Sequence, residues 1–354
     1  MTPPRNEIIC GDALEVLKTL PSESVDMCVT SPPYWACRFY DAGEKEIGIE
    51  KSFEEYLSRL VEIFDEVKRV LKKEGTCFVN LGDTYNGNKE GKTDLKVAQH
   101  TGENSKGIHK KQSNSLPEKC ICMIPERFAI AMSERGWLVR NKIIWHKKNG
   151  MPSSVIDRLG NKYELVYFFT KSPRYFFDLD AIRVPYETYE KRPDGIVRGR
   201  EYDYHGKFAE HAENYGSPRA RQGRKYNTKE GSKNRELEEQ SRRFGKRRPP
   251  GDSSLYERNP KGKNPGDVWT LTLQPHPDKH VAMFPEKLIE PMVLAGCPDG
   301  GLVLDIFMGA GTTAVVSKKL GRHYLGIELN PKYIEIAEKR IRGTTPSLFT
   351  PPQS

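Results

Sequence analysis

The chain has 354 residues, a mean hydropathy of −0.69 and a formal net charge of +9. This length suffices for one large α/β domain with a smaller inserted or appended region. Because no run of about 18 apolar residues occurs, the composition excludes a membrane span. The first seven residues also lack the apolar region of a secretory signal, so we expect a cytoplasmic protein.

The seven cysteines are scattered along the chain and odd in number. Cys120 and Cys122 have the wrong spacing for a zinc knuckle, and no second pair or histidine cluster accompanies them. We therefore expect reduced thiols, with no metal site and no disulfide.

Hydrophobic periodicity predicts alternating strands and helices. Ser52 is expected to cap the longest of the early helices, and Gly75 to terminate it. Strands are expected over 7–10 (short and buried), 25–30, 76–81, 137–145, 163–170, 301–306 and 323–328, and helices over 13–20, 53–71, 124–136, 282–296, 311–320 and 333–342. This alternation is typical of a parallel sheet with crossover helices, an α/β fold.

Two polar regions interrupt the alternation. Residues 84–116 are rich in Gly, Asn, Lys, Ser and Thr, which indicates a long mobile loop. Residues 183–267 hold 21 Lys and Arg against 14 Asp and Glu, with nine aromatic residues among them. Such a basic surplus suits a polyanionic partner, although a solvated flexible loop would have the same composition.

A cofactor motif is visible near the C-terminal end. Residues 302–306 read as a buried strand that carries Asp305, and Gly309 and Gly311 then form a turn into a helix. Glycines let a ligand approach the backbone, and a helix N-terminus favours an anionic group. Glu328 ends the next strand, 23 positions after Asp305, where a carboxylate can hold ribose hydroxyls. The set predicts a nucleotide-type cofactor.

A second motif follows the strand at 25–30. Ser31, Pro32, Pro33 and Tyr34 come directly after it, at the carboxyl edge of the sheet where ligands bind in open α/β folds. The prolines fix the backbone and leave carbonyl oxygens to accept hydrogen bonds, and an aromatic ring can stack on a planar base. A purely structural Pro-Pro turn is the alternative.

The tetrapeptide Ser31–Tyr34, together with the glycine motif near the C-terminal end, resembles the circularly permuted, β-class DNA amino-methyltransferases of bacterial restriction–modification systems and phages. Three further segments resemble this family: 8–12, the W-x-K-x-N-x-x-P element at 145–152, and the H-x-A-x-F-P-x-x-L element at 280–288. The resemblance covers about 1–83, 120–180 and 267–342. It implies a Rossmann-like methyltransferase sheet that uses S-adenosylmethionine.

The resemblance also implies the domain organisation. Residues 1–183 would form the catalytic half, 184–266 an inserted, loop-rich target recognition region, 267–342 the cofactor-binding half, and 343–354 a tail. Within the target recognition region, a basic cluster would contact DNA unless it is only a solvated charge run: Arg242, Arg243, Lys246, Arg247 and Arg248.

The family also implies a role for each motif residue. Ser31 and Pro32 would face the amino group of a base flipped out of the duplex, beside Pro33, and Tyr34 would stack on that base. Cofactor contacts would come from Asp12 at the adenine side, Glu328 at the ribose, Asp305, Gly309 and Gly311 at the methionine half, and Phe284, Pro285, Phe307 and Thr312 nearby. No metal is expected.

One departure concerns the family's DPFxGSGTT motif, in which Ile306 replaces the proline and Ala310 the serine. The acid, both glycines and the aromatic residue remain, so we expect cofactor binding to persist.

Ser31 favours N4 of cytosine over N6 of adenine, because the family's adenine enzymes usually carry Asp at this position. Alternatives are an N6-adenine enzyme of the same fold, a non-catalytic DNA-binding specificity subunit, and an RNA or protein methyltransferase. Expected partners are double-stranded DNA and, within a restriction–modification system, a cognate endonuclease. The chain would act as a monomer or homodimer.

Overall fold

The structure is a computed structural model that describes residues 2–35, 43, 45–87, 115–150, 155–186, 259–272 and 284–345. The chain divides into two compact units, Met1–Arg183 with Asn264–Ser354, and Val184–Lys263. In the second unit, an antiparallel bridge joins Val184 to Lys263. The basic cluster at 242–248 and most of the expected loop at 84–116 lie outside the described residues.

The first unit is built on an eight-stranded sheet with the order β1-β8-β7-β2-β3-β5-β4-β6. Its strands are β1 (Glu7–Cys10), β2 (Val25–Thr30), β3 (Leu71–Leu81), β4 (Leu138–Lys147), β5 (Tyr163–Thr170), β6 (Val268–Leu271), β7 (Leu302–Asp305) and β8 (His323–Glu328). Every neighbouring pair is parallel except β3/β5 and β5/β4. The prediction of a parallel sheet is therefore wrong for β5. No crossover helix is described between β4 and β5, and the chain returns antiparallel.

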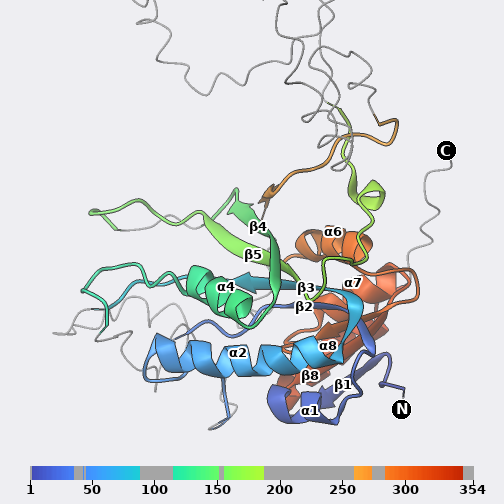
Figure 1. Cartoon of the computed structure of the whole chain (residues 1–354), viewed down its shortest axis with the longest axis horizontal. Coiled ribbons are helices and arrows are strands. Elements are labelled where there is room, and N and C mark those ends of the chain that lie inside the picture. Colours follow the sequence, from blue (N-terminus) through green and yellow to red (C-terminus); the bar gives the residue numbers. More distant parts are fainter. Residues whose placement is uncertain are drawn as a thin grey trace, which may run out of the picture. The chain divides into compact units, whose positions relative to one another are not determined.

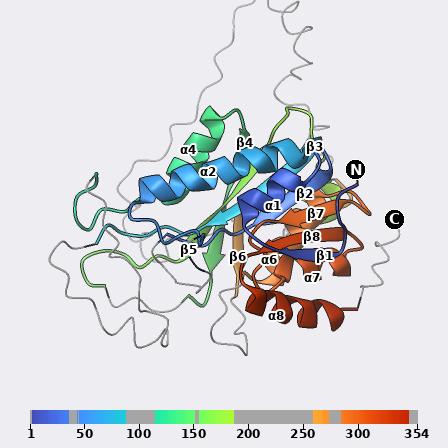
Figure 2. The same ribbon diagram turned by 90° about the horizontal axis from the view of Figure 1, so that it is seen from below.

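Helices cover both faces of this sheet (Figures 1 and 2). On one face lie α1 (Ala13–Thr19), α2 (Phe53–Val70) and α4 (Ile124–Glu134). On the other lie α6 (Glu286–Gly296), α7 (Thr312–Lys319) and α8 (Pro331–Arg342), with a short 3₁₀ helix, η2 (Asp180–Ile182), beside α6. The predicted α/β class, with a Rossmann-like sheet, is confirmed.

Helix α2 begins where the sequence predicts. The hydroxyl of Ser52 accepts a hydrogen bond from the Glu55 amide at 3.2 Å, which satisfies one of the free N–H groups of the first turn. The helix ends at Val70 rather than at Gly75, and the strand starts at once. Gly75 lies inside β3, where a Cβ atom would come within 2.6 Å of the Leu71 side chain. Close packing, not helix termination, explains this glycine.

Strand β1 differs from the prediction in burial. Ile8 and Ile9 are only half-buried, while Glu7 and Cys10 are more open, because β1 is the edge strand and pairs with β8 alone in the described sheet. The short strand β6, at the opposite edge, is absent from the predicted elements. Its four residues carry little periodicity, and pairing with β4 defines it.

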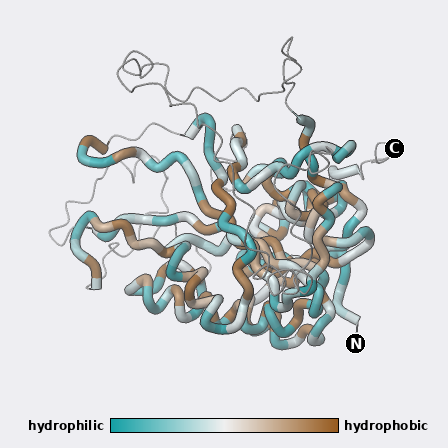
Figure 3. Tube along the Cα trace, turned by 45° about the horizontal axis from the view of Figure 1, so that its top comes forward, coloured by the Kyte–Doolittle hydropathy of each residue, from teal (hydrophilic) through white to brown (hydrophobic). Residues whose placement is uncertain are grey.

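Apolar side chains fill the space on both faces of the sheet, and hydrophobic stretches of the chain run through the interior in Figure 3. Phe78 of β3 and Phe168 of β5 stack with ring centroids 4.4 Å apart, which adds to the burial of the central strands. In the described parts of the chain, no helix is both long and apolar enough to cross a membrane.

Candidate active site

The ends of neighbouring parallel strands bring the sequence motifs together. Strands β1, β8, β7 and β2 run side by side in the same direction, so the segments that follow them emerge at one edge of the sheet (Figure 1). These segments carry Asp12, Leu329, Phe307 and Ser31, from four places in the sequence. The carboxyl edge of a parallel sheet is where such folds bind ligands.

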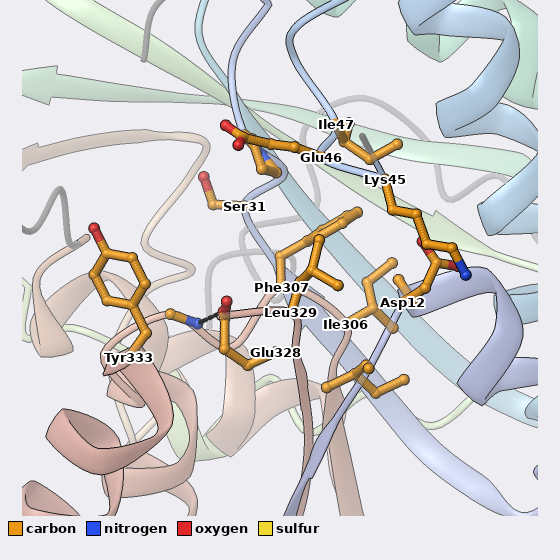
Figure 4. Close-up of a pocket in the computed structure, with 15 residues that line it drawn as sticks. Asp12, Ser31, Lys45, Glu46, Ile47, Ile306, Phe307, Glu328, Leu329 and Tyr333 are labelled. Carbon is orange, nitrogen blue, oxygen red and sulfur yellow. Dashed lines mark hydrogen bonds between the residues drawn. The ribbon is translucent and has the colours of Figure 1, made fainter. Parts of the chain in front are cut away.

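A cavity opens at this edge and contains about 780 Å³ of empty space, including its open mouth. Figure 4 shows that side chains from both halves of the chain point into it. The lining residues are Gly11, Asp12, Ala13, Ser31, Pro33, Lys45, Glu46, Ile47, Ile306, Phe307, Gly309, Ile327, Glu328, Leu329 and Tyr333.

Glu328 is held by the backbone around it. One carboxylate oxygen accepts the Gly309 amide at 2.8 Å, drawn as a dashed line in Figure 4, and the other accepts the Asn330 amide at 2.8 Å. Burial raises the pKa of Glu328, against the opposing effect of these N–H donors. Each oxygen keeps a further lone pair, so the carboxylate can also accept from a bound hydroxyl group.

Asp305 lies beneath the cavity rather than in its wall. Its side chain is 1% exposed, and its two oxygens accept from the Thr30 hydroxyl at 2.7 Å, the Thr313 hydroxyl at 2.6 Å and the Phe307 amide at 3.1 Å. Burial raises the pKa of Asp305 to about 6 although these donors favour the charged form. Asp305 thus ties the end of β2 to the glycine turn and positions both.

The two glycines of the turn play different parts. Both have left-handed backbones, with φ of 52° at Gly309 and 79° at Gly311. Gly309 lines the cavity, and a Cβ there would meet only the Phe307 carbonyl oxygen, at 3.9 Å. A Cβ at Gly311 would lie 2.8 Å from that of Ala337 in α8, so this glycine permits helix packing. Thr312 is buried and accepts a hydrogen bond from Arg340 at 3.2 Å.

Ser31 and Tyr34 share one buried acceptor. The Ser31 hydroxyl lies 3.3 Å from Asn80 Oδ1, and the Tyr34 phenol lies 3.0 Å from the same atom and 2.8 Å from Glu164 Oε2. The side-chain amide of Asn80 is oriented by donation to the Leu165 carbonyl at 3.1 Å. Glu164 is itself paired with Lys147. The network fixes the tetrapeptide against β3 and β5.

The backbone of the tetrapeptide is braced as well. The Tyr56 hydroxyl of α2 donates to the Pro33 carbonyl at 3.0 Å. The ring of Tyr34 lies so close to Gly82 that a Cβ there would come within 2.5 Å of Tyr34 Cε2. Only a glycine fits this position without a shift of the ring.

Residues 45–47 form a cavity wall that sequence reasoning missed. Arg59 of α2 donates to the Lys45 and Glu46 carbonyls, at 3.2 Å each, and its guanidinium pairs with the buried carboxylate of Glu50 at 2.6 Å. The side chain of Glu46 is 2% exposed, and Figure 4 shows its carboxylate on the Ser31 side of the cavity. These residues carry no local sequence motif, because their position depends on hydrogen bonds from Arg59 in α2.

The structure therefore brings part of the predicted site together. Asp12, Ser31, Pro33, Phe307, Gly309 and Glu328 line one cavity, whereas its lining does not include Pro32, Tyr34, Asp305, Gly311 and Thr312. Phe284 and Pro285 lie outside the lining too; Phe284 packs on the apolar cluster at the α6 face, and Pro285 caps α6. Tyr333, in the first turn of α8, was not predicted, although the Asn330-Pro331 helix start marks its element. Among the described residues, no group of three or more His, Cys, Asp or Glu could hold a metal ion.

The chain is similar to known DNA methyltransferases. Residues 25–339 match the N6/N4 methyltransferase family, described as DNA methylase. The Type II methyltransferase M.Cfr9I of Citrobacter freundii is 34% identical over 333 residues, covering 94% of this chain and 86% of that protein. M.SfiI of Streptomyces fimbriatus is 32% identical over 394 residues, covering 92% and 88%.

Solved structures share the fold at low sequence identity. The PvuII DNA methyltransferase, a cytosine-N4-specific enzyme, superposes with a TM-score of 0.57 at 17% identity, covering 96% of this chain and 87% of that one. The structure of TTHA0409 from Thermus thermophilus, complexed with S-adenosyl-L-methionine, gives a TM-score of 0.50 at 20% identity, covering 98% of this chain and 100% of that one. From the family match over most of its length, together with the two relatives above 30% identity, the chain belongs to the N6/N4 family of DNA methyltransferases.

Proposed function

We propose that this chain transfers a methyl group from S-adenosylmethionine to the exocyclic N4 of a cytosine that is flipped out of duplex DNA. The observation that carries the proposal is the placement of Ser31 in the wall of the same cavity as Gly309 and Glu328. One site thus holds both a group suited to the target amine and groups suited to a nucleoside.

The cavity residues fit this cofactor. Its ribose hydroxyls would donate to Glu328, and Asp12 would lie at its adenine side, where Phe307 supplies an apolar surface. The cofactor has two positive groups, a sulfonium and an ammonium, and one carboxylate. The cavity offers the opposite balance, with Asp12, Glu46 and Glu328 against Lys45. When bound, the cofactor supplies an electrophilic methyl group.

The residues of the chain supply the acceptor side of the reaction. An exocyclic amine is a weak nucleophile because its lone pair is delocalised into the ring, and acceptors facing its N–H groups favour the pyramidal, positively charged nitrogen of transfer. Ser31 can donate its proton to Asn80, which leaves the lone pairs of its oxygen for the amine. The Pro32 carbonyl would be the second acceptor, and Tyr34 would stack on the base. The nitrogen gains the methyl group and releases one proton to water.

Cytosine is preferred over adenine because Ser31 occupies the first tetrapeptide position. The cytosine-N4 specificity of the PvuII enzyme, whose fold is shared, agrees with this choice. We also propose that the chain is circularly permuted, with its catalytic half before its cofactor half, that residues 184–266 recognise the DNA sequence, and that a cognate endonuclease accompanies it. Adenine N6 is the second candidate, since the matched family includes both activities.

The test is expression in a host that lacks DNA methylation, followed by methylation-aware sequencing and mass spectrometry of digested DNA. We expect N4-methylcytosine within one short sequence motif. N6-methyladenine would refute the base assignment and keep the mechanism. Unmodified DNA would instead favour a non-catalytic DNA-binding subunit.

Cofactor binding is tested separately by isothermal titration with S-adenosylmethionine in the presence of EDTA. We expect binding without metal, and weaker binding by the Glu328→Ala variant. A strict requirement for a divalent cation would contradict the proposed site.

A further inference from the structure

The loop that precedes β5 exposes its aliphatic side chains. Ile156 is 100% exposed and Leu159 is 90% exposed. In Figure 3 this loop projects from the sheet, and its tip is coloured as hydrophobic. Isolated apolar residues are common on protein surfaces, but two large aliphatic side chains that are almost fully in water, within four positions, indicate a surface with a partner.

The polar side chains of the same loop contact neighbouring segments of the protein. Asp157 pairs with Lys119 at 2.8 Å, the Arg158 guanidinium lies 3.8 Å from the ring centroid of Tyr85, and Asn161 accepts from the Tyr85 hydroxyl at 3.3 Å. The polar residues of the loop therefore bind it to neighbouring segments, while its apolar residues Ile156 and Leu159 are exposed to solvent. This is the reverse of an ordinary solvated loop, and it pre-organises the apolar tip for contact.

The tip lies near the tetrapeptide. Strand β4 runs parallel to β3 and β2, so the chain leaves β4 at the sheet edge where Ser31 is found. Just after the loop, Glu164 accepts from the Tyr34 hydroxyl at 2.8 Å. Because Leu159 precedes Glu164 by five residues, their Cα atoms are at most about 18 Å apart. Leu159 is thus closer to Glu164, which contacts Tyr34, than the width of a DNA duplex whose target base enters the site.

We infer that Ile156 and Leu159 form an apolar wedge that enters the base stack of the duplex beside the flipped base. The inference rests on the proposed function. Extrusion of a base leaves a gap whose neighbouring bases lose their stacking partner, and inserted aliphatic side chains replace that contact. DNA is the partner because a stretch of only five residues joins Leu159 to Glu164, whose side chain contacts the tetrapeptide proposed to receive the base.

The experiment compares the double variant Ile156→Ser/Leu159→Ser with the control Ile130→Ser, which removes a 60% exposed aliphatic side chain from α4. Both act on duplexes that carry the sequence identified by methylation sequencing. In one duplex the target cytosine is paired, and in the other an abasic residue lies opposite it, so that extrusion costs less. On the paired duplex we expect kcat/KM of the double variant to fall roughly 10- to 100-fold, and on the abasic one by less than about 3-fold.

The control variant should match the unaltered protein on both duplexes, and S-adenosylmethionine affinity and the melting temperature should stay unchanged in the double variant. Equal losses on both duplexes, or full activity on the paired one, would overturn the wedge alone. A changed sedimentation coefficient in the double variant would also overturn it, by assigning the tip to a second copy of the chain. No methylation by the unaltered protein would overturn the proposed function and the wedge with it.

Discussion

Asn80 connects the two side chains on which the proposed mechanism depends. Its Oδ1 atom lies within hydrogen-bond distance of both the Ser31 hydroxyl and the Tyr34 phenol, and its own amide is fixed by the Leu165 carbonyl. A carboxamide oxygen accepts but does not take up a proton at neutral pH. Asn80 therefore orients Ser31 without acting as its base, which agrees with an amine that loses its proton after transfer.

Removal of the Ser31 hydroxyl gives the sharpest test of this arrangement. Ser31→Ala should lower methyl transfer by roughly 10²–10³-fold, the usual effect of deleting one group that meets developing charge. Binding of S-adenosylmethionine and of DNA should stay nearly unchanged, as measured by titration and by electrophoretic mobility shift. A fully active Ser31→Ala protein would contradict the mechanism.

Two variants of Tyr34 distinguish the effect of ring stacking from that of hydrogen bonding by the phenol. Tyr34→Ala should reduce activity through the loss of base stacking, which is worth about 1–3 kcal/mol per base. Tyr34→Phe keeps the ring and loses only the contacts of the phenol with Asn80 and Glu164, so it should recover most of the rate. Initial rates of tritium transfer to DNA provide the comparison, and equal losses in both variants would exclude stacking as the main role.

Asp305 should make stability depend on pH. Its pKa is raised from 3.8 to about 6 in the folded protein, so the native state favours the neutral form. The contribution of this pKa shift to the free energy of unfolding is fully present below about pH 3.8, and it is lost as the pH rises through about 6. Between pH 4 and pH 7, the free energy of unfolding of Asp305→Asn should therefore decrease less than that of the unaltered protein. Urea denaturation at several pH values measures it, and identical pH profiles would show that Asp305 titrates normally.

At the scale of elements, the two glycines of the turn between β7 and α7 have different roles: Gly309 lines the cavity, and Gly311 packs against α8. Gly309→Ala places a methyl group toward the cavity and should weaken binding of S-adenosylmethionine, while the left-handed backbone costs roughly 1–2 kcal/mol. Gly311→Ala has the same backbone cost and also forces a methyl group against Ala337, which adds about 1–3 kcal/mol. Thermal melts and cofactor titrations should rank the two variants in opposite orders. The same order in both measurements would contradict the division of roles.

Some elements could be predicted from the sequence because they are locally specified. Strands β2, β5 and β8 have the predicted bounds, since apolar runs at 25–30, 163–170 and 323–328 carry the signal within themselves. Strand β6 and the wall at 45–47 could not be predicted. Pairing with β4 defines the first, and donation from Arg59 to two carbonyls fixes the second, so both depend on contacts between distant segments.

The same distinction applies to the candidate site. The motifs at 31–34 and 305–328 show which residue types meet at the sheet edge, and Ser31, Gly309 and Glu328 do line one cavity. The burial of Asp305 under three donors was not visible in the motif. An acidic residue at a strand end can face a ligand or the core. Here the hydroxyls of Thr30 and Thr313 donate to the Asp305 carboxylate and hold it in the core.

At the scale of the whole molecule, DNA binding should depend on the basic residues at 242–248, whose structure lies outside the described residues. Replacing Arg242, Arg243, Arg247 and Arg248 by Ala should weaken binding to duplex DNA and reduce its salt dependence, because fewer counterions are released. Cofactor affinity should be retained. Fluorescence anisotropy at several salt concentrations provides the measurement, and unchanged slopes would identify the cluster as a solvated surface.

The strand order has a consequence for the synthesis of the chain. Strands β7 and β8, made last, lie between β1 and β2, made first, and the link from Thr30 to Asp305 spans 275 positions. Before residue 302 is translated, β2 exposes an unpaired edge, and β1 lacks the only strand that it pairs with in the described sheet. Such edges and such distant pairings make folding slow and invite association. The cavity therefore forms only after the ribosome has released β8, and a nascent chain that still lacks β8 cannot modify DNA.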